Sequence, residues 1–292
     1  MMGPFRCIAD LREQLLESPV WDERRGVLFL CSILSREVLE LDLDTGVRRR
    51  WPFEAEVVSL GLCDSGALVV GLAREVIVFE PDTGQRRSLW RGYDEPATSR
   101  LNDGKVGPDG AFWIGSMDMR QPRAPVGRLY RVTADGAATT IADGFAVSNG
   151  LAWSPDGRTL YHSDSFAAWI DRYDFDSRTG EAGNRRRLRD LDEETGRPDG
   201  AACDAAGDYW SAGVSAGVLN RITPEGALRA RYPLPVPAPT MPCFCGADLR
   251  QIAITSHRQT TPEKLERAPL SGGVFLAEAP VAGAPVARMR GL

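Results

Sequence analysis

The stretch that decides the fold is LAWSPDGRTLYHSDSFAAWIDRYDFDSRTG, residues 151–180. Strand-like runs alternate in it with turn residues, and the same pattern recurs six times along the chain. Equivalent turn positions, spaced 40, 44, 47, 50 and 41 residues apart, are occupied by Gly26, Gly66, Gly110, Gly157, Gly207 and Asp248. A period of about 40–50 residues made only of strand-like segments is typical of a β-propeller. The sequence therefore predicts an all-β, six-bladed β-propeller that forms a single domain over residues 1–292.

A ring of blades leaves an open sheet edge unless the first and last strands pair. The apolar segment 5–10 is therefore expected to complete the blade formed by residues 273–289. The longest connections are expected between blades, where loops carry specificity. They are predicted at residues 93–100, 120–126, 190–197 and 234–242.

Composition excludes several classes of protein. The net charge of −5 argues against a nucleic-acid partner, and the local basic run 185–189 is interpreted as a solvated loop. No window approaches about 18 apolar residues, so no membrane partner is expected. The N-terminus lacks the pattern of a secretion signal, and the six cysteines are interpreted as reduced thiols. We expect a cytoplasmic protein that is a monomer or a weak homo-oligomer.

Polar residues stand directly before several strand-like runs, where a purely structural interpretation has little use for them. They occupy one register of the repeat in blades one, three, four and five, and they are Glu17, Arg100, Asn102, Asp103, Asn149 and Asp199. Innermost strands of a propeller run along its central axis, so equivalent positions at their starts converge on one ring. The sequence therefore predicts a polar site at one end of the central channel.

Three of these residues have the chemistry of a metal site. Glu17, Asn149 and Asp199 offer oxygen ligands, which suit a divalent ion such as Ca²⁺, Mg²⁺, Mn²⁺, Fe²⁺ or Zn²⁺. Three protein ligands leave positions for water and substrate, as in a catalytic site. Asn-Gly and Asp-Gly are also turn formers, but recurrence at one register favours a central metal site. Asp103 is expected to cap a loop, and the two histidines, His162 and His257, are interpreted as rim residues.

The chain resembles the SMP-30/gluconolactonase/regucalcin family over nearly its whole length. The resemblance is carried by RLNDGK at 100–105, SNGL at 148–151, SPDG at 154–157 and PDG at 198–200. It implies a six-bladed propeller with a divalent metal on Glu17, Asn149 and Asp199. It implies further that Arg100 and Asn102 hold oxygens of the substrate, and that the reaction is hydrolysis of a sugar lactone to the aldonic acid.

Two departures from the family concern the substrate more than the metal. Ser18 follows Glu17 where the family usually has glycine. Arg120 stands where an acidic substrate contact is expected, and the nearby Asp118 is a substitute for it. The predicted substrate-binding residues are therefore Arg100, Asn102, Asp118 and Arg120.

A mechanism follows as a hypothesis, with two alternatives. The metal would polarise the lactone carbonyl, and Asp199 would orient and deprotonate the attacking water. The first alternative is a metal-dependent hydrolase of another ester or of a phosphotriester. The second is a calcium-binding propeller without enzymatic activity.

Overall fold

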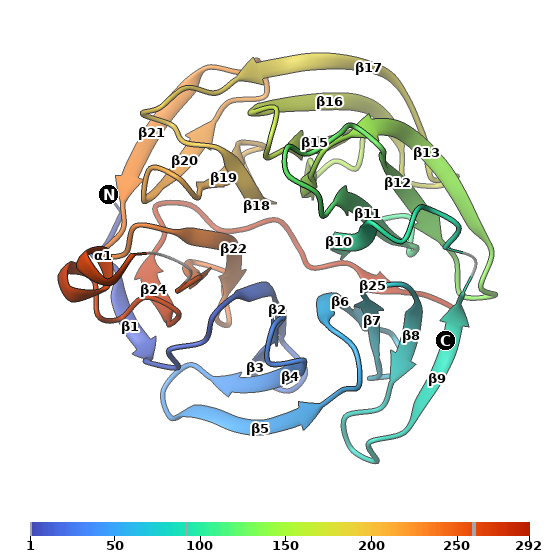
Figure 1. Cartoon of the computed structure of the whole chain (residues 1–292), viewed down its shortest axis with the longest axis horizontal. Helices are drawn as coiled ribbons and strands as arrows, with labels where there is room; N and C mark the ends of the chain where they lie inside the picture. Colours follow the sequence, from blue (N-terminus) through green and yellow to red (C-terminus); the bar gives the residue numbers. More distant parts are fainter. Residues whose placement is uncertain (1, 92, 259–260) are drawn as a thin grey trace.

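The computed structural model describes residues 2–91, 93–258 and 261–292, and it consists of six β-sheets arranged around a central axis (Figure 1). The strands of the first three sheets, taken from the axis outward, are β2 (Leu16–Asp22), β3 (Val27–Ser32), β4 (Glu37–Asp42) and β5 (Gly46–Pro52); β6 (Val57–Cys63), β7 (Leu68–Leu72), β8 (Val76–Phe79) and β9 (Arg86–Trp90); and β10 (Ser99–Val106), β11 (Phe112–Asp118), β12 (Gly127–Val132) and β13 (Ala138–Phe145).

The remaining sheets follow the same plan. Their strands are β14 (Ser148–Trp153), β15 (Thr159–Asp164), β16 (Trp169–Asp176) and β17 (Glu181–Asp190); β18 (Pro198–Cys203), β19 (Tyr209–Gly213), β20 (Val218–Ile222) and β21 (Leu228–Pro233); and β22 (Pro239–Cys245), β23 (Gln251–Ser256), β24 (Val274–Glu278) and β1 (Arg6–Ala9). Each innermost strand contacts the next one, and β22 contacts β2, so the ring is closed. The prediction of a six-bladed β-propeller is confirmed.

Both ends of the chain contribute to closure. Strand β1 pairs antiparallel with β24, with Arg6 opposite Leu276 and Cys7 opposite Phe275. The predicted pairing of the N-terminal segment with the last blade is therefore confirmed. The chain beyond β24 does not stay in that blade: it crosses the middle of the ring, and β25 (Arg288–Met289) pairs parallel with β6 of the second blade (Figure 1).

Two local predictions are corrected. The basic run 185–189 is not a loop but part of β17, an outer strand, where Arg185 and Arg187 pair with Asp171 at 2.8 and 2.6 Å. The segment 120–126 joins β11 to β12 within one blade, whereas the other three predicted loops do connect blades. The short helix α1 (Pro262–Arg267) lies in the last blade, and no helix among the described residues is long and apolar enough to span a membrane.

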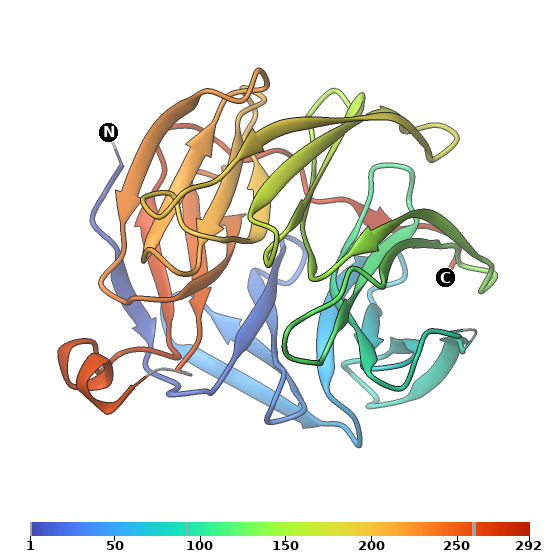
Figure 2. The same ribbon diagram turned by 45° about the horizontal axis from the view of Figure 1, so that its top comes forward.

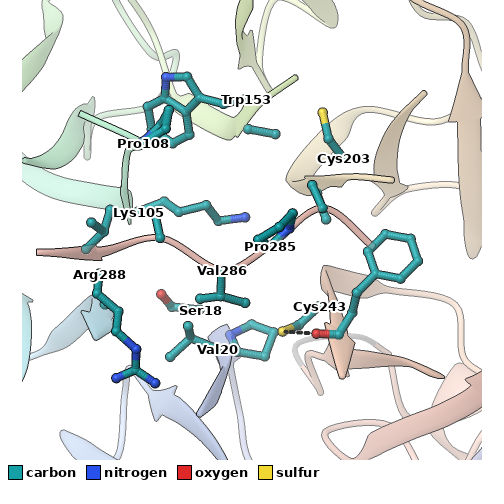
Figure 3. A pocket seen from close by; sticks show the side chains of 18 of the residues that line it. Ser18, Val20, Lys105, Pro108, Trp153, Cys203, Cys243, Pro285, Val286 and Arg288 are labelled. Atoms are coloured by element: carbon teal, nitrogen blue, oxygen red, sulfur yellow. Dashed lines mark hydrogen bonds between the residues drawn. The ribbon is translucent and has the colours of Figure 1, made fainter. Parts of the chain in front are cut away.

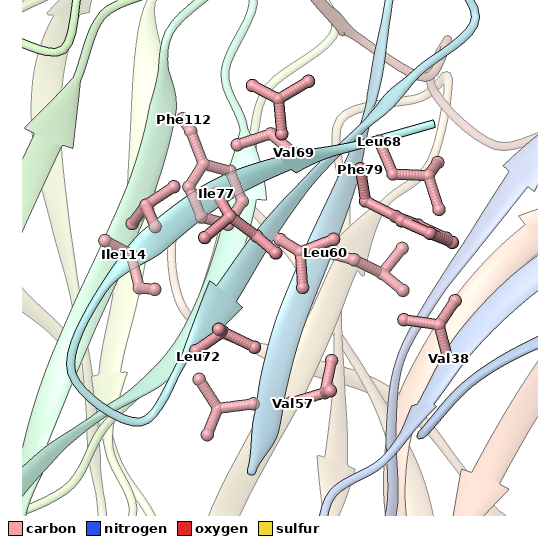
Figure 4. Close-up of a cluster of buried hydrophobic side chains, with 14 of the residues drawn as sticks. Val38, Val57, Leu60, Leu68, Val69, Leu72, Ile77, Phe79, Phe112 and Ile114 are labelled. Atoms are coloured by element: carbon pink, nitrogen blue, oxygen red, sulfur yellow. The ribbon is translucent and has the colours of Figure 1, made fainter. Parts of the chain in front are cut away.

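Apolar wedges between neighbouring blades hold the ring together. Figure 4 shows part of this packing: Leu68 and Phe79 of the second blade lie toward Val38 of the first blade, and Phe112 and Ile114 of the third blade lie on the other side of the second. These side chains are at most 2% exposed. Strands buried on both faces explain why runs such as Leu68–Leu72 are continuously apolar. Figure 2, turned by 45°, shows the blades side by side around the central axis. The apolar packing between blades sets the position at which each innermost strand starts.

Candidate active site

Every innermost strand has an irregular start. Its pairing with the second strand of the blade shifts in register, as at a β-bulge. In the four blades that carry predicted site residues, the shifts lie between Glu17 and Val20, Leu101 and Gly104, Asn149 and Ala152, and Pro198 and Ala201. The blades starting with β6 and β22 have the same irregularity. Bulges re-aim side chains and are common beside active sites. The repeat in the sequence predicts the register of these residues, but it does not predict the bulges.

Asn149 and Asp199 meet directly across two blades. The amide Nδ2 of Asn149 donates to Asp199 Oδ1 at 2.6 Å and to Ser165 Oγ at 2.8 Å. Both amide hydrogens are thus used by the protein in the assigned amide orientation. Asn149 Oδ1 accepts no hydrogen bond from the described residues, which leaves it as the atom available to a cation.

Glu17 lies in the same group of charges. Burial and the negative charges of Asp199 and Asp103 raise the pKa of Glu17 well above its usual range. Burial and the charge of Asp103 likewise raise the pKa of Asp199, although Arg197 opposes this. Like charges held together in this way are stabilised by a cation. The residues therefore fit a divalent ion held by two carboxylates and one amide oxygen.

Asp103 is the third carboxylate of this group, and the sequence predicts only a loop-capping role for it. Asp103 is 5% exposed and its Oδ2 accepts the Leu151 N–H at 3.1 Å, so it does tie two blades together. Its Oδ1 is buried without a partner among the described residues, and burial raises its pKa although Lys105 opposes this. The described residues contain no cluster of three or more His, Cys, Asp and Glu side chains that forms a metal site by itself. The predicted ligand set depends on Asn149.

Ser18 occupies the position at which the family resemblance predicts a glycine. Its φ of 52° lies in the left-handed region, which favours glycine. The Ser18 hydroxyl is buried and accepts the Leu60 N–H at 2.9 Å. This bond to the next blade offsets the backbone strain and holds the adjacent Glu17 in place.

Arg100 and Asn102 are brought together beside the metal-type site. Arg100 Nη1 donates to Asn102 Oδ1 at 2.9 Å, and Asn102 Nδ2 donates to the main-chain oxygen of Ser148 at 3.0 Å. The Asn102 amide thus links the arginine to the strand that carries Asn149. Contact of Arg100 and Asn102 with a substrate stays a prediction.

Asp118 and Arg120 form a loop anchor. Asp118 is fully buried, and its carboxylate accepts Arg120 Nε at 2.9 Å and the Ala124 N–H at 2.7 Å. The Arg120 guanidinium and these N–H groups lower the pKa of Asp118 to about 2. Their direct role in substrate binding stays a prediction; the contacts show that they shape the loop between β11 and β12.

The two histidines differ. His257 is half-buried and follows β23, as a rim residue would. His162 is 0% exposed, so its interpretation as a rim residue is wrong. Its Nε2 lies 2.7 Å from Ser148 Oγ, behind the strand that carries Asn149. Burial, together with the charge of Arg185, lowers the pKa of His162 to about 3.

The neutral His162 ring makes stability depend on pH. The unfolded chain protonates this ring near pH 6.5, whereas the folded protein does so only near pH 3. Between these values the unfolded state binds more protons, so the free energy of unfolding falls as the pH falls, by up to about 1.4 kcal/mol per pH unit. Urea unfolding at pH 7.5, 6.0 and 4.5 should show a shallower loss for His162→Gln. Equal losses for both proteins would contradict the prediction.

The other end of the channel holds a separate cavity of about 510 Å³. It is lined by later residues of the innermost strands, among them Lys105, Trp153 and Cys203, and by the C-terminal residues 284–288 and 290 (Figure 3). Glu17, Asn149 and Asp199 do not line it. The candidate site is therefore the opposite end of the channel, at the strand starts.

The fold and the site together define a six-bladed propeller with an acidic site at one end of its axis. The chain belongs to the SMP-30/gluconolactonase/LRE-like family, whose characteristic region matches residues 15–258. It is 37% identical over 285 residues to a 6-deoxy-6-sulfogluconolactonase from Pseudomonas putida, with 97% of each chain covered. It is 33% identical over 277 residues to regucalcin from Xenopus laevis, with 93% of each covered. The crystal structure of a calcium-binding protein, regucalcin, from Agrobacterium tumefaciens has a TM-score of 0.92 at 26% identity and covers 99% of this chain and 98% of its own.

Proposed function

We propose that this protein is a divalent-metal-dependent hydrolase that opens a sugar lactone to the aldonic acid. The observation that carries the proposal is the meeting of Asn149 with Asp199, at 2.6 Å, beside Glu17. The amide oxygen of Asn149 accepts no hydrogen bond, and the carboxylates of Glu17 and Asp199 form no ion pair, within the described part of the chain. Membership of the family and the name of the Pseudomonas relative, a lactonase, support the same class of reaction.

Glu17, Asn149 and Asp199 are the residues that would hold the ion. When bound, the ion supplies Lewis-acid polarisation of the carbonyl and stabilises negative charge on its oxygen. Oxygen ligands accept Ca²⁺, Mg²⁺, Mn²⁺, Fe²⁺ or Zn²⁺. The naming of the Agrobacterium neighbour as a calcium-binding protein makes Ca²⁺ the first ion to test.

The chain's own residues supply proton transfer and orientation. Asp199 has one oxygen fixed by Asn149, and the other accepts no hydrogen bond from the described residues. Its raised pKa suits a base that takes a proton from an attacking water. Arg100, held by Asn102, would orient the ring oxygens so that the carbonyl faces the ligands. The name of the Pseudomonas relative adds a sulfonated gluconolactone to the candidate substrates.

Metal removal tests the proposal. Protein stripped with a chelator should hydrolyse aldonolactones no faster than buffer, because its carboxylates then have no ion to align the substrate. Adding back Ca²⁺, Mg²⁺, Mn²⁺, Fe²⁺ or Zn²⁺ in turn should restore proton release on one or more lactones. Restored activity on an aryl ester or a phosphotriester alone would instead support the broader esterase. Tight calcium binding without turnover of any of these would identify a binding protein.

A further inference from the structure

Several basic side chains lie at the same end of the ring as the candidate site. Arg123 is on the loop after β11, and β11 ends opposite the start of β10, since Ser99 pairs with Asp118. Arg197 directly precedes β18. His257 directly follows β23, whose Ser256 pairs with the start of β22. Three different blades thus bring a basic group to one mouth.

These groups are close enough to act on one another and on the site. Burial and the charge of Arg197 lower the pKa of His257. Burial lowers the pKa of Arg123, Asp118 opposes this, and Arg197 adds to it. The charge of Arg197 also opposes the rise in the pKa of Asp199. The charge of Arg197 therefore reaches the proposed base and both of the other basic groups.

The two arginines are not neutralised by the protein. Arg123 donates to the main-chain oxygen of Asp118, and neither Arg123 nor Arg197 pairs with a carboxylate in the described part of the chain. Arg120 on the same loop differs, because it is paired with Asp118 at 2.9 Å. The protein as a whole has a net charge of −5, yet these two guanidinium groups beside the candidate site form no ion pair with a carboxylate of the described residues.

We propose that Arg123 and Arg197, with His257 beside them, form an anion subsite for a charged group on the lactone. The group would be a sulfonate, phosphate or carboxylate at the end of the sugar remote from the carbonyl. This inference rests on the proposed function. Guanidinium groups bind such anions through paired, charge-assisted hydrogen bonds. The subsite would also offset the repulsion between an anionic substrate and the carboxylates of Glu17, Asp103 and Asp199.

Matched lactones test the inference. Glucono-1,5-lactone is compared with its 6-deoxy-6-sulfo, 6-phospho and 6-carboxylate counterparts on the metal-loaded wild type, Arg123→Gln and Arg197→Gln. Wild type should prefer at least one anionic lactone, and each variant should lose about tenfold or more in kcat/KM on it. Arg123→Gln should keep hydrolysis of the neutral lactone within about twofold. Arg197→Gln also changes the charge near Asp199, so it should lower the ratio of kcat/KM for the anionic lactone to that for the neutral lactone. Raising the salt concentration should slow only the anionic substrate.

The control variant is Arg178→Gln, whose side chain is 82% exposed on the turn between β16 and β17. It should leave all rates unchanged. Equal loss on neutral and anionic lactones in Arg123→Gln and Arg197→Gln would overturn the subsite while leaving the proposed lactonase intact. So would a wild type without preference for any anionic lactone. No hydrolysis of any lactone by wild type would overturn both proposals.

Discussion

Asp199→Asn should lower kcat/KM for an aldonolactone by about a hundredfold or more, the contribution of a positioned general base. Asparagine has the shape of aspartate and keeps an oxygen for a cation, but it cannot take a proton from water. The Asn149 amide, now 2.6 Å from Asp199 Oδ1, can still donate to the new side-chain oxygen. The variant should therefore fold normally and keep measurable metal binding. Proton release and calorimetric metal titration on the same preparation measure both quantities.

A matched control is Asp143→Asn, an exposed residue of the outer strand β13. It should leave turnover and metal affinity unchanged. Turnover of Asp199→Asn within about threefold of wild type would show that Asp199 is not the base. Loss of metal binding in proportion to loss of turnover would show that it acts only as a ligand.

The fold could be predicted from the sequence because the same pattern of strands and turns occurs six times. Each blade buries both faces of its inner strands, so turn residues and apolar runs return at a near-constant spacing. The register of Glu17, Asn149 and Asp199 was readable for the same reason. Their meeting across blades depends on the bulges, which are a property of strand pairing and have no single residue signature.

Other features depend on tertiary contacts that a repeat does not encode. The polar sequence around His162 predicts a rim residue. In the structure His162 is buried beneath the first strand of its blade, where its ring hydrogen-bonds with Ser148. Asp118 and Arg120 were predicted as substrate contacts, and the structure shows them paired to each other. The sequence places Arg197 in a long loop but does not predict that it lies near Arg123 and His257. These residues belong to three different blades, which come together only in the closed ring.

Glu17→Gln should have opposite effects on function and on metal-free stability. In the metal-free protein the Glu17 side chain is half-buried, and the charges of Asp199 and Asp103 act on it. Removing its charge relieves this repulsion, and the glutamine oxygen can still accept the Ser18 N–H, now 3.0 Å from Glu17 Oε2. The melting temperature of the metal-free variant should rise, by about 2–4 °C for each 1 kcal/mol gained.

With metal present the order should reverse. Wild type gains stability by mass action, about 2.7 kcal/mol when the free ion is at 100 times its Kd. The variant, having lost a charged ligand, should show weaker binding, a smaller gain and little lactone turnover. Thermal unfolding with and without each ion, together with kcat/KM, measures these effects. A metal-free variant less stable than wild type would contradict the repulsion argument.

Glu13→Gln is the matched control, because Glu13 lies just before the same strand in a different environment. Its carboxylate accepts hydrogen bonds from Ser35 at 2.6 Å, Arg50 at 2.7 Å and Ser32 at 2.8 Å. Burial acts to raise the pKa of Glu13, but these bonds outweigh it and hold the pKa below its usual value. The charge therefore stabilises the fold there, and Glu13→Gln should lower the melting temperature without changing metal affinity. The two substitutions, four residues apart, should therefore change the melting temperature of the metal-free protein in opposite directions. This result would distinguish a carboxylate that binds the metal from one that stabilises the fold.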